Sequence, residues 1–484
     1  MEKQVKPLLS ILEEILAKDR LIMHMPGHKA GRLFSEQFKS HLLQYDLTEL
    51  PGLDNLHRAR GVLADSMKAC AKAFGARESF FLVNGSTSGI HAMLAASLNK
   101  GDKLIVVRNC HISVINALIL FGIHPVFIMP RYDEQWQMVL PPSIESWRKT
   151  LDENPDVKGA LVTSPDYYGL CTPLEELACL LHEREKFLLV DEAHGAHFAF
   201  SCHLPQTALQ QGADACVQSF HKTMPALTQT AVLHLGTDRI CCDRLKRCIS
   251  MLTTTSPSYM LMASMEYACD FASREGQESY ERLIGALNEM KTELADMDKL
   301  RLVPDSLCGF QRDATRIVVD TSQTTFSGYH FSSILEHDYD IIAEMADETH
   351  VVFIVTPADT TEELHTVIKA LKELDKKVMP CNPKAGIRPF EVQPGRCEIP
   401  SLSDYLGNVA YIPIESSIGF VSVSMVTPYP PGVPLLCPGE TITENIIAQV
   451  QKLMHCGCEL QGLTGNNGLI AVLDQRHENR PAQG

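Results

Sequence analysis

Basic residues are scarce in this chain of 484 residues, which has 43 Lys and Arg against 59 Asp and Glu and a formal net charge of -16 at pH 7. Nucleic acids and anionic membranes attract proteins through basic surfaces. The charge balance therefore argues against a nucleic-acid or membrane partner. It suits a cationic small molecule, although many enzymes that bind other substrates are equally acidic.

A long uninterrupted apolar run is also missing. The most apolar stretch, residues 117–129, is broken by Gly122 and by His124-Pro125, whereas a membrane-spanning helix needs about 20 apolar residues. Residues 1–20 read as an amphipathic helix with charges distributed along it and no small-residue cleavage site, which argues against a secretory signal. We expect a cytoplasmic protein.

Metal-ligand spacing is absent as well, despite 16 cysteines. Cysteines spread along a chain without an export signal are typical of reduced, buried thiols. Neither Cys241-Cys242 nor Cys456-Gly-Cys458 has the spacing of an ordinary zinc site. We expect no metal.

Short apolar runs alternate with helical patterns between about residues 60 and 240. The predicted strands are 80–83, 103–107, 125–129, 159–163, 187–191 and 215–219, and helical patterns occupy 87–98, 111–121 and 174–185. This alternation predicts a mostly parallel sheet covered by helices on both faces. In such sheets the ligand lies beyond the carboxyl ends of the strands.

The chain is too long for one hydrophobic core. Residues 259–297 are predicted to form a helical connector, and strands at 315–320 and 351–355 with a helix at 361–374 indicate a smaller α/β unit. The stretch 378–396 is rich in Pro, Gly and Lys and is predicted to be a loop. We expect an N-terminal arm (1–60), a large domain (61–300) and a small C-terminal domain (301–484).

Two polar motifs directly follow predicted strands, at the ends where a parallel sheet binds its ligand. Residues 84–89, Asn-Gly-Ser-Thr-Ser-Gly, open a helix whose amino end could bind a phosphate, though an ordinary helix cap has the same pattern. Asp191 ends an apolar strand and begins Asp-Glu-Ala-His-Gly-Ala-His. Its carboxylate could pair with a protonated ring nitrogen or, with His194 and His197, with a metal.

Two further residues complete the pattern. A lone loop lysine is usually a solvated charge, but Lys222, in Ser219-Phe-His-Lys222, follows a strand at the expected crevice. Desolvation and nearby positive charge would lower its pKa and give the neutral amine that a Schiff base needs. His111 could cap a helix or stack on a planar ring. Together, the four motifs would bind a phosphate, a basic ring nitrogen, the face of a planar ring and an aldehyde. Pyridoxal phosphate has all four groups.

On these residues the sequence resembles the Orn/Lys/Arg decarboxylase family, a branch of the fold-type I (aspartate aminotransferase-like) pyridoxal-phosphate enzymes. The matching segments occur in the same order as in the family and extend along nearly the whole chain. The most specific of them are Ser219-Phe-His-Lys222 and residues 429–440. The matching segments are His24-Met-Pro-Gly-His-Lys29, Leu50-Pro-Gly-Leu-Asp-Asn-Leu-His57, Asn84-Gly-Ser-Thr-Ser88, Asp191-Glu-Ala-His-Gly195, Ser219-Phe-His-Lys222, Leu252-Thr-Thr-Thr-Ser-Pro257 and Tyr429-Pro-Pro-Gly-Val-Pro-Leu-Leu-Cys-Pro-Gly-Glu440.

The resemblance implies a role for each matching site residue. Lys222 binds the cofactor covalently, Asp191 pairs with the pyridine nitrogen and His111 lies on the ring face. The other residues that it places around the cofactor are Ser86, Thr87, Ser88, Ala193, His194, Ser219 and His221. Lys222 and His221 are also the candidates for returning a proton to the substrate carbon.

The resemblance also implies a homodimer, because Thr254 and Ser256 would reach the phosphate of the neighbouring subunit. It is closest to the short form of the family, since Pro26-Gly-His comes near the N-terminus. We therefore expect a dimer or a dimer of dimers.

The implied reaction is decarboxylation of a basic amino acid, with arginine to agmatine as first choice and lysine to cadaverine or ornithine to putrescine close behind. Glu440, Asp54 and Glu49 are candidates for binding the distal cation. One alternative is an aminotransferase or carbon–sulfur lyase of the same fold, with Arg388 or Arg396 binding the substrate carboxylate. Another is a homologue without catalytic activity.

Overall fold

The large sheet has seven strands, and its topology explains where the polar motifs meet. The computed structural model describes residues 7–382, 399–407, 409–429, 432–455, 458–464 and 468–473. The strand order is β2 (Glu78–Leu82), β10 (Ala231–Leu235), β9 (Ala215–Gln218), β8 (Phe187–Asp191), β7 (Gly159–Thr163), β3 (Lys103–Val107) and β4 (His124–Ile128). Only β10 runs antiparallel to its neighbours. The mostly parallel sheet is confirmed, and β10 is a strand that the sequence analysis missed.

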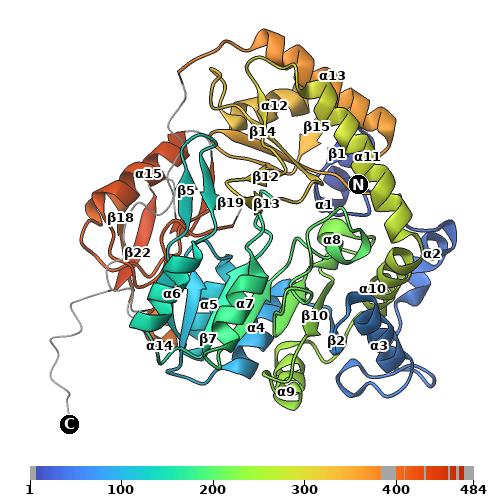
Figure 1. Ribbon diagram of the computed structural model, residues 1–484, viewed down its shortest axis with the longest axis vertical. Helices are drawn as coiled ribbons and strands as arrows, with labels where there is room; N and C mark the ends of the chain where they lie inside the picture. The colour runs from blue at the N-terminus through green and yellow to red at the C-terminus, as the bar shows by residue number, and fades with distance from the viewer. Residues whose placement is uncertain are drawn as a thin grey trace, which may run out of the picture.

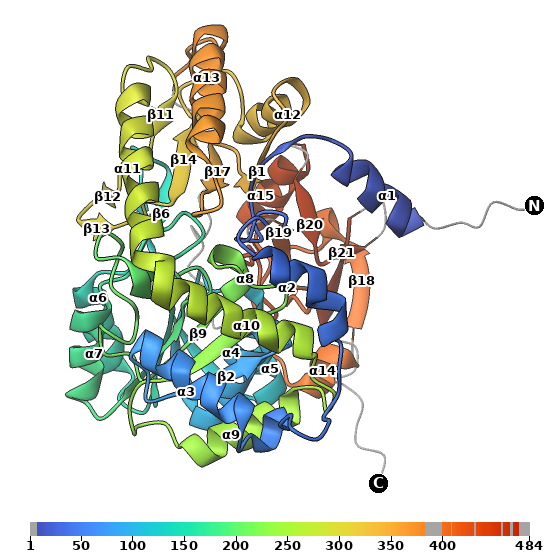
Figure 2. The ribbon, with the colours of Figure 1, turned by 90° about the vertical axis from the view of Figure 1, so that its right-hand side faces the viewer.

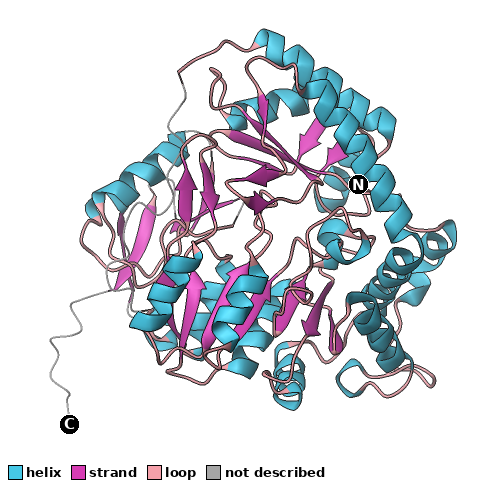
Figure 3. Ribbon diagram, in the orientation of Figure 1, coloured by secondary structure: helices cyan, strands magenta, loops and turns pink. Residues whose placement is uncertain are grey.

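Both faces of this sheet are covered, as Figure 3 shows. Leu104 and Val106 of β3 pack in one hydrophobic cluster with α4 (Gly85–Ser97), α5 (Ile112–Phe121) and α9 (Cys242–Leu252). Ile105 and Val107 pack in another with α6 (Ile144–Glu153) and α7 (Leu174–His182). Side chains alternate between the two faces of a strand, so a continuously apolar strand such as β3 must be buried on both sides.

A long helical connector leads to the second sheet. It consists of α10 (Tyr259–Phe271), a π-helical turn at Ala272–Gly276 and α11 (Gln277–Leu294). The second sheet is antiparallel, in the order β11 (Arg301–Leu302), β14 (Arg316–Asp320), β17 (His350–Ile354) and β16 (Met345–Ala346). Helices α12 (Gly328–Asp338) and α13 (Thr361–Lys377) pack on it. The predicted strands and helix of this unit are confirmed.

The last part of the chain forms a separate small sheet of β18 (Val409–Pro413), β22 (Leu469–Leu473) and β21 (Leu463–Thr464), packed on α15 (Glu444–His455). Figure 1 shows it in orange and red beside the other two sheets. The described residues after 300 thus form two sheets of three or more strands, beside the two-stranded pairs β12–β13 (Ser306–Leu307 and Phe310–Gln311) and β19–β20 (Thr427–Tyr429 and Glu459–Gln461). The division of the chain at residues 60 and 300 stays a prediction, and most of the predicted loop 378–396 lies outside the described residues.

The N-terminal segment crosses from the second sheet to the first. α1 (Pro7–Leu16) lies on the outside of the molecule (Figure 2), and β1 (Leu21–Met23) pairs in parallel with β15 (Ile341–Ala343). All residues of α1 are exposed, including its apolar ones. The remaining elements are α2 (Glu36–His41), α3 (Val62–Phe74), β5 (Arg131–Asp133), β6 (Met138–Leu140), α8 (Phe220–Thr223) and α14 (Leu402–Leu406). No helix in the described ranges is long and apolar enough to cross a bilayer.

Candidate active site

Lys222 lies in α8, the short helix that follows β9 at the carboxyl end of the large sheet. Its Nζ is 2.9 Å from Nε2 of His194 and 5.7 Å from the centre of the Tyr167 ring. Burial, together with the charge of Arg316, lowers the pKa of Lys222 to about 8. The charges of Asp191 and Glu344 act in the opposite direction. At this pKa roughly a tenth of the amine is neutral at pH 7, and the neutral amine is the form in which a lysine acts as a nucleophile.

Asp191 is the last residue of β8, the strand beside β9, and only 2% of it is exposed. Its Oδ1 accepts a hydrogen bond of 3.2 Å from the backbone N–H of Ala193. Burial raises the pKa of Asp191, and the nearby Lys222 opposes this rise. A buried carboxylate interacts strongly with a cation because the local dielectric constant is low, so Asp191 can hold a proton on a ring nitrogen.

The residues predicted to bind phosphate lie around the amino end of α4. The hydroxyl of Ser219 donates a hydrogen bond of 2.8 Å to that of Ser86, which joins the loop after β9 to this helix. Ser88 is buried, and its hydroxyl donates to the Gly85 carbonyl at 2.8 Å, whereas Thr87 is exposed. The first N–H groups of a helix are free to bind an anion, so Ser86 and Ser219 are the better placed hydroxyls.

His111 fulfils the capping interpretation of the sequence and still lies near the lysine. Its Nδ1 accepts a hydrogen bond of 3.2 Å from the N–H of Ser113 at the start of α5. Burial lowers the pKa of His111 to about 3, and the charge of Lys222 lowers it too. The imidazole is therefore neutral. Gly432 lies near the His111 ring: it has a φ of +80°, and a Cβ added at this position would be 3.5 Å from the ring.

His221, next to Lys222, is anchored by the backbone. Its Nδ1 donates a hydrogen bond of 2.9 Å to the carbonyl of Thr230. Burial lowers the pKa of His221 to about 4, although that hydrogen bond opposes the change. At neutral pH the ring therefore carries its single proton on Nδ1, where Thr230 holds it.

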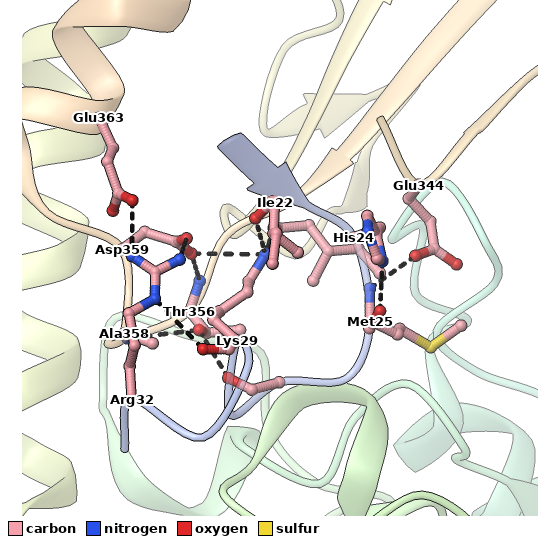
Figure 4. A network of polar contacts seen from close by, with 12 residues as sticks. Ile22, His24, Met25, Lys29, Arg32, Glu344, Thr356, Ala358, Asp359 and Glu363 are labelled. Atoms are coloured by element: carbon pink, nitrogen blue, oxygen red, sulfur yellow. Dashed lines mark hydrogen bonds and ion pairs between the residues drawn. The ribbon is translucent and has the colours of Figure 1, made fainter. Parts of the chain in front are cut away.

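The motif His24–Lys29 fixes the turn that carries Lys222. The N–H of Gly27 donates to the His221 carbonyl at 2.7 Å, and its own carbonyl accepts a bond of 2.9 Å from the hydroxyl of Thr356. Lys29 is fully buried and donates a hydrogen bond of 2.8 Å to the carbonyl of Ile22 (Figure 4). It donates another, of 2.7 Å, to the carbonyl of Ile354 in β17. This segment therefore connects α8 to the second sheet.

Thr254 and Ser256 are exposed, and no contact described for this chain links them to Lys222 or Asp191. The Thr254 hydroxyl accepts the N–H of Ser256 at 3.2 Å, and the Thr254 carbonyl accepts a bond of 2.8 Å from His57. Their predicted role in a neighbouring subunit's site stays a prediction.

Several residues at the site were not found by sequence reasoning. Tyr167 follows β7 in the motif Asp166-Tyr-Tyr-Gly, whose place after a parallel strand was the available signal. Arg316 is the first residue of β14 in the second sheet, Asp313 lies in the loop before it, and Glu344 lies between β15 and β16. No local pattern marks these three, because they reach the site through the packing of one sheet on the other.

A cavity of roughly 150 Å³ adjoins His111 and Tyr167. Its wall contains three carboxylates, those of Asp166, Asp347 and Glu348. Burial raises the pKa of Asp166 to about 6. Asp347 is held by His350, which is 3.2 Å away. Asp166 also accepts the N–H groups of Tyr168 and Leu170, at 2.9 and 2.8 Å, so both of these carboxylates have partners within the protein.

The three carboxylates proposed from the sequence for the distal cation have other partners. Glu440 accepts two hydrogen bonds of 2.8 Å from Arg108, and Asp54 accepts the N–H groups of Gly61 and Leu63 at 2.7 and 3.0 Å. Glu49 accepts a bond of 3.1 Å from Asn55 on the surface.

The two histidines of the Asp191 motif face different partners. His194 contacts Lys222 and Arg316, whereas Nε2 of His197 lies 3.2 Å from Asp313. Within the described ranges, no group of three or more His, Cys, Asp or Glu side chains could hold a metal ion.

The residues present fit pyridoxal phosphate. Asp191 is a buried carboxylate with one backbone hydrogen bond, Lys222 is a buried amine with a lowered pKa, and Ser86 and Ser219 meet at a helix amino end. The fold and the site thus define a pyridoxal-phosphate enzyme of fold type I. Solved structures with this fold include the lysine decarboxylases of Francisella novicida (TM-score 0.78, 19% identity, 93% of this chain and 78% of that one) and Pseudomonas aeruginosa (0.75, 22%, 97% and 80%).

The chain belongs to the Orn/Lys/Arg decarboxylase family. Residues 6–308 match the major domain of that family, and residues 403–464 match its C-terminal domain. An arginine decarboxylase of Bacillus anthracis is 33% identical over 469 residues, with 94% of each chain covered. One of Bacillus subtilis is 31% identical over 475 residues, with 96% of each covered. The expected family, fold, cofactor and enzyme class are confirmed, and the protein is a decarboxylase.

Proposed function

We propose that this decarboxylase acts on a basic amino acid and converts arginine to agmatine, with lysine and ornithine as the competing substrates. The similarity to arginine decarboxylases along 94% of both chains carries the choice of arginine. The carboxylates in the cavity beside His111 support a cationic side chain. Coulomb attraction in a partly buried cavity is several times stronger than in water, so the negative charge of these carboxylates would favour a cationic side chain, although Asp166 and Asp347 are also bound by protein groups.

Pyridoxal phosphate, when bound, supplies the electron sink that accepts the bonding electrons left by CO2. Lys222 would hold it covalently, and Asp191 would keep its ring nitrogen protonated. His111, neutral and close to Lys222, would lie on the ring face. The amino end of α4, with Ser86 and Ser219, would bind the phosphate. The protein must also hold the substrate carboxylate perpendicular to the ring plane, because only then does the breaking bond align with the ring's π system.

Lys222 is the better of the two candidates for returning a proton to the substrate carbon. The one proton of a neutral His221 is held at Nδ1 by the Thr230 carbonyl. Among the residues that the structure describes, no backbone carbonyl binds Nζ of Lys222, and the pKa of about 8 allows this amine to gain and lose a proton near neutral pH.

We further propose a homodimer with shared sites. Residues that complete the site of a neighbouring subunit must lie on the surface of the isolated chain. Thr254 and Ser256 meet this requirement, because both are exposed. The exposed apolar side chains of α1, among them Leu8, Leu12 and Ile15, are unusual for a monomer's surface. A dimer of dimers and a cytoplasmic location stay predictions.

A CO2-release assay with arginine, lysine and ornithine, with cofactor added, tests the substrate. We expect the highest kcat/KM for arginine and agmatine as the product. Faster release from lysine or ornithine would move the assignment to that substrate. An oxo acid in place of an amine would support the aminotransferase alternative, whose carboxylate-binding candidates Arg388 and Arg396 lie outside the described residues.

A further inference from the structure

His194 connects Lys222, in the helix α8 that follows β9, to Arg316 of the second sheet. Its Nε2 is 2.9 Å from Nζ of Lys222, and its Nδ1 accepts a hydrogen bond of 2.9 Å from Nη2 of Arg316. Both His194 and Arg316 are buried, and the arginine lies 3.9 Å from the carboxylate of Asp313. The two ring nitrogens of His194 thus each face a nitrogen of a basic side chain.

This arrangement fixes the tautomer of His194. A guanidinium has only donors and does not lose its proton in proteins, so Nδ1 of His194 must be the acceptor and carry no proton. Burial lowers the pKa of His194 well below its usual range, and the charge of Arg316 lowers it further. The ring is therefore neutral, and its single proton lies on Nε2, toward Lys222.

The proton on Nε2 in turn selects the state of Lys222. An ammonium has three donors and no acceptor, so it would place N–H against N–H at 2.9 Å. A neutral amine has a lone pair that accepts the bond. We propose that Arg316 is a positioning residue, which acts through His194 to favour the free-amine form of Lys222, the form that captures the cofactor aldehyde.

Other charged groups face Lys222 and affect the equilibrium between its ammonium and its neutral amine. Asp191 and Glu344 favour the ammonium, and Arg316 opposes it directly as well as through His194. His111 and His221, which also lie near, are neutral, because burial lowers the pKa of each far below 7. Two carboxylates would thus keep Lys222 charged if burial and the Arg316–His194 pair did not act against them.

The proposal rests on the proposed role of Lys222, yet it can be tested without cofactor. Trace acetylation of the full cofactor-stripped chain with acetic anhydride over a range of pH, with Lys222 located by mass spectrometry, gives the pKa of that amine. For the unaltered chain we expect Lys222 to have a pKa of about 8. Arg316→Met should reduce labelling at pH 7 about tenfold, the effect of one lost hydrogen bond and its charge.

A double-mutant cycle separates the hydrogen-bonded route from a direct charge effect. If Arg316 acts through His194, then Arg316→Met in a His194→Phe background should change labelling less than about threefold. Equal changes in both backgrounds would overturn the proposal and leave only charge repulsion between Arg316 and Lys222. Circular dichroism and melting temperature show whether each variant is folded.

The unaltered chain provides a second measurement that needs no folded variant. The side-chain ¹⁵N shifts of His194, assigned with His194→Gln, report its tautomer. Protonated Nε2 with bare Nδ1 supports the proposal, and a proton on Nδ1 contradicts it. A protein that failed to bind pyridoxal phosphate would refute the proposed function but would leave both measurements valid, so the two failures are distinguishable.

Discussion

The guanidinium of Arg108, directly after β3, donates two hydrogen bonds of 2.8 Å to the carboxylate of Glu440. It also donates to the carbonyls of Pro434 and Leu435, at 2.8 and 3.2 Å. This buried pair therefore ties the Val-Pro-Leu-Leu-Cys-Pro-Gly-Glu segment to the edge of the large sheet. Val433, Pro434 and Leu435 of this segment line the cavity beside His111, so the pair also orders one wall of the candidate site.

Glu440→Gln should destabilise the protein, because removal of one charge leaves Arg108 buried without its counter-charge. Breaking a buried ion pair in this way costs about 3–5 kcal/mol. Chemical denaturation measures the loss. Glu444→Gln, on an exposed position of α15, is the control and should change stability by less than about 0.5 kcal/mol. Equal effects would show that the pair contributes little.

Lys222→Ala should abolish turnover and the visible absorbance that the cofactor gains when it bonds to the lysine. The physical reason is that no other amine of the chain contacts His194 and Tyr167 in the described site. Absorbance spectra and CO2 release measure the two effects. Lys149→Ala, with an exposed side chain, should match the unaltered enzyme. Steady turnover by the Lys222 variant would remove this lysine from its role.

Asp191→Ala should retain the covalent bond to Lys222 but reduce kcat by roughly 10²–10³, the usual cost of losing one preorganised electrostatic partner. The ring nitrogen would then lose its proton more easily, and the electron sink would weaken. Single-turnover kinetics with the spectrum of the bound cofactor check this expectation. A kcat within threefold of the unaltered enzyme would show that another group protonates the ring.

Gly27→Ala should disturb the turn that carries Lys222. A Cβ at this position would lie 2.6 Å from the backbone carbonyl carbon of Thr223, so α8 would have to move. We expect at least a tenfold loss of kcat/KM, since small displacements of catalytic groups are costly. Gly285→Ala is the matched control, because its Cβ would meet nothing within 4 Å, and alanine stabilises a helix relative to glycine.

Hybrid dimers test the shared site. Lys222→Ala chains mixed with chains carrying Thr254→Ala and Ser256→Ala should form dimers in which one of the two sites has only unaltered residues. Activity should therefore rise above that of either parent, toward half of the unaltered value per hybrid. If Thr254 and Ser256 serve their own chain, mixing restores nothing. Size-exclusion chromatography with light scattering confirms the dimer.

The sequence alone determined the class of fold and the motif residues of the site. Apolar runs alternating with helical patterns specify a parallel sheet, and residues such as Asp191 and Lys222 that follow its strands must meet at one edge because parallel strands end together. These are local signals, and they also carried the family resemblance. Strand β10 was missed because only the four-residue helix α8 separates it from β9, so it does not follow the alternation of strands and longer helices on which the prediction rested.

Only the tertiary structure decided which distant residues complete the site. Arg316 reaches His194 across 122 positions of sequence, and Glu440 reaches Arg108 across 332. No pattern within a strand or helix predicts such contacts, because they depend on how one sheet packs against another. The pKa of Lys222 follows the same rule: its burial and its charged neighbours are properties of the packed molecule, so the chemistry of that amine was set by the fold around it.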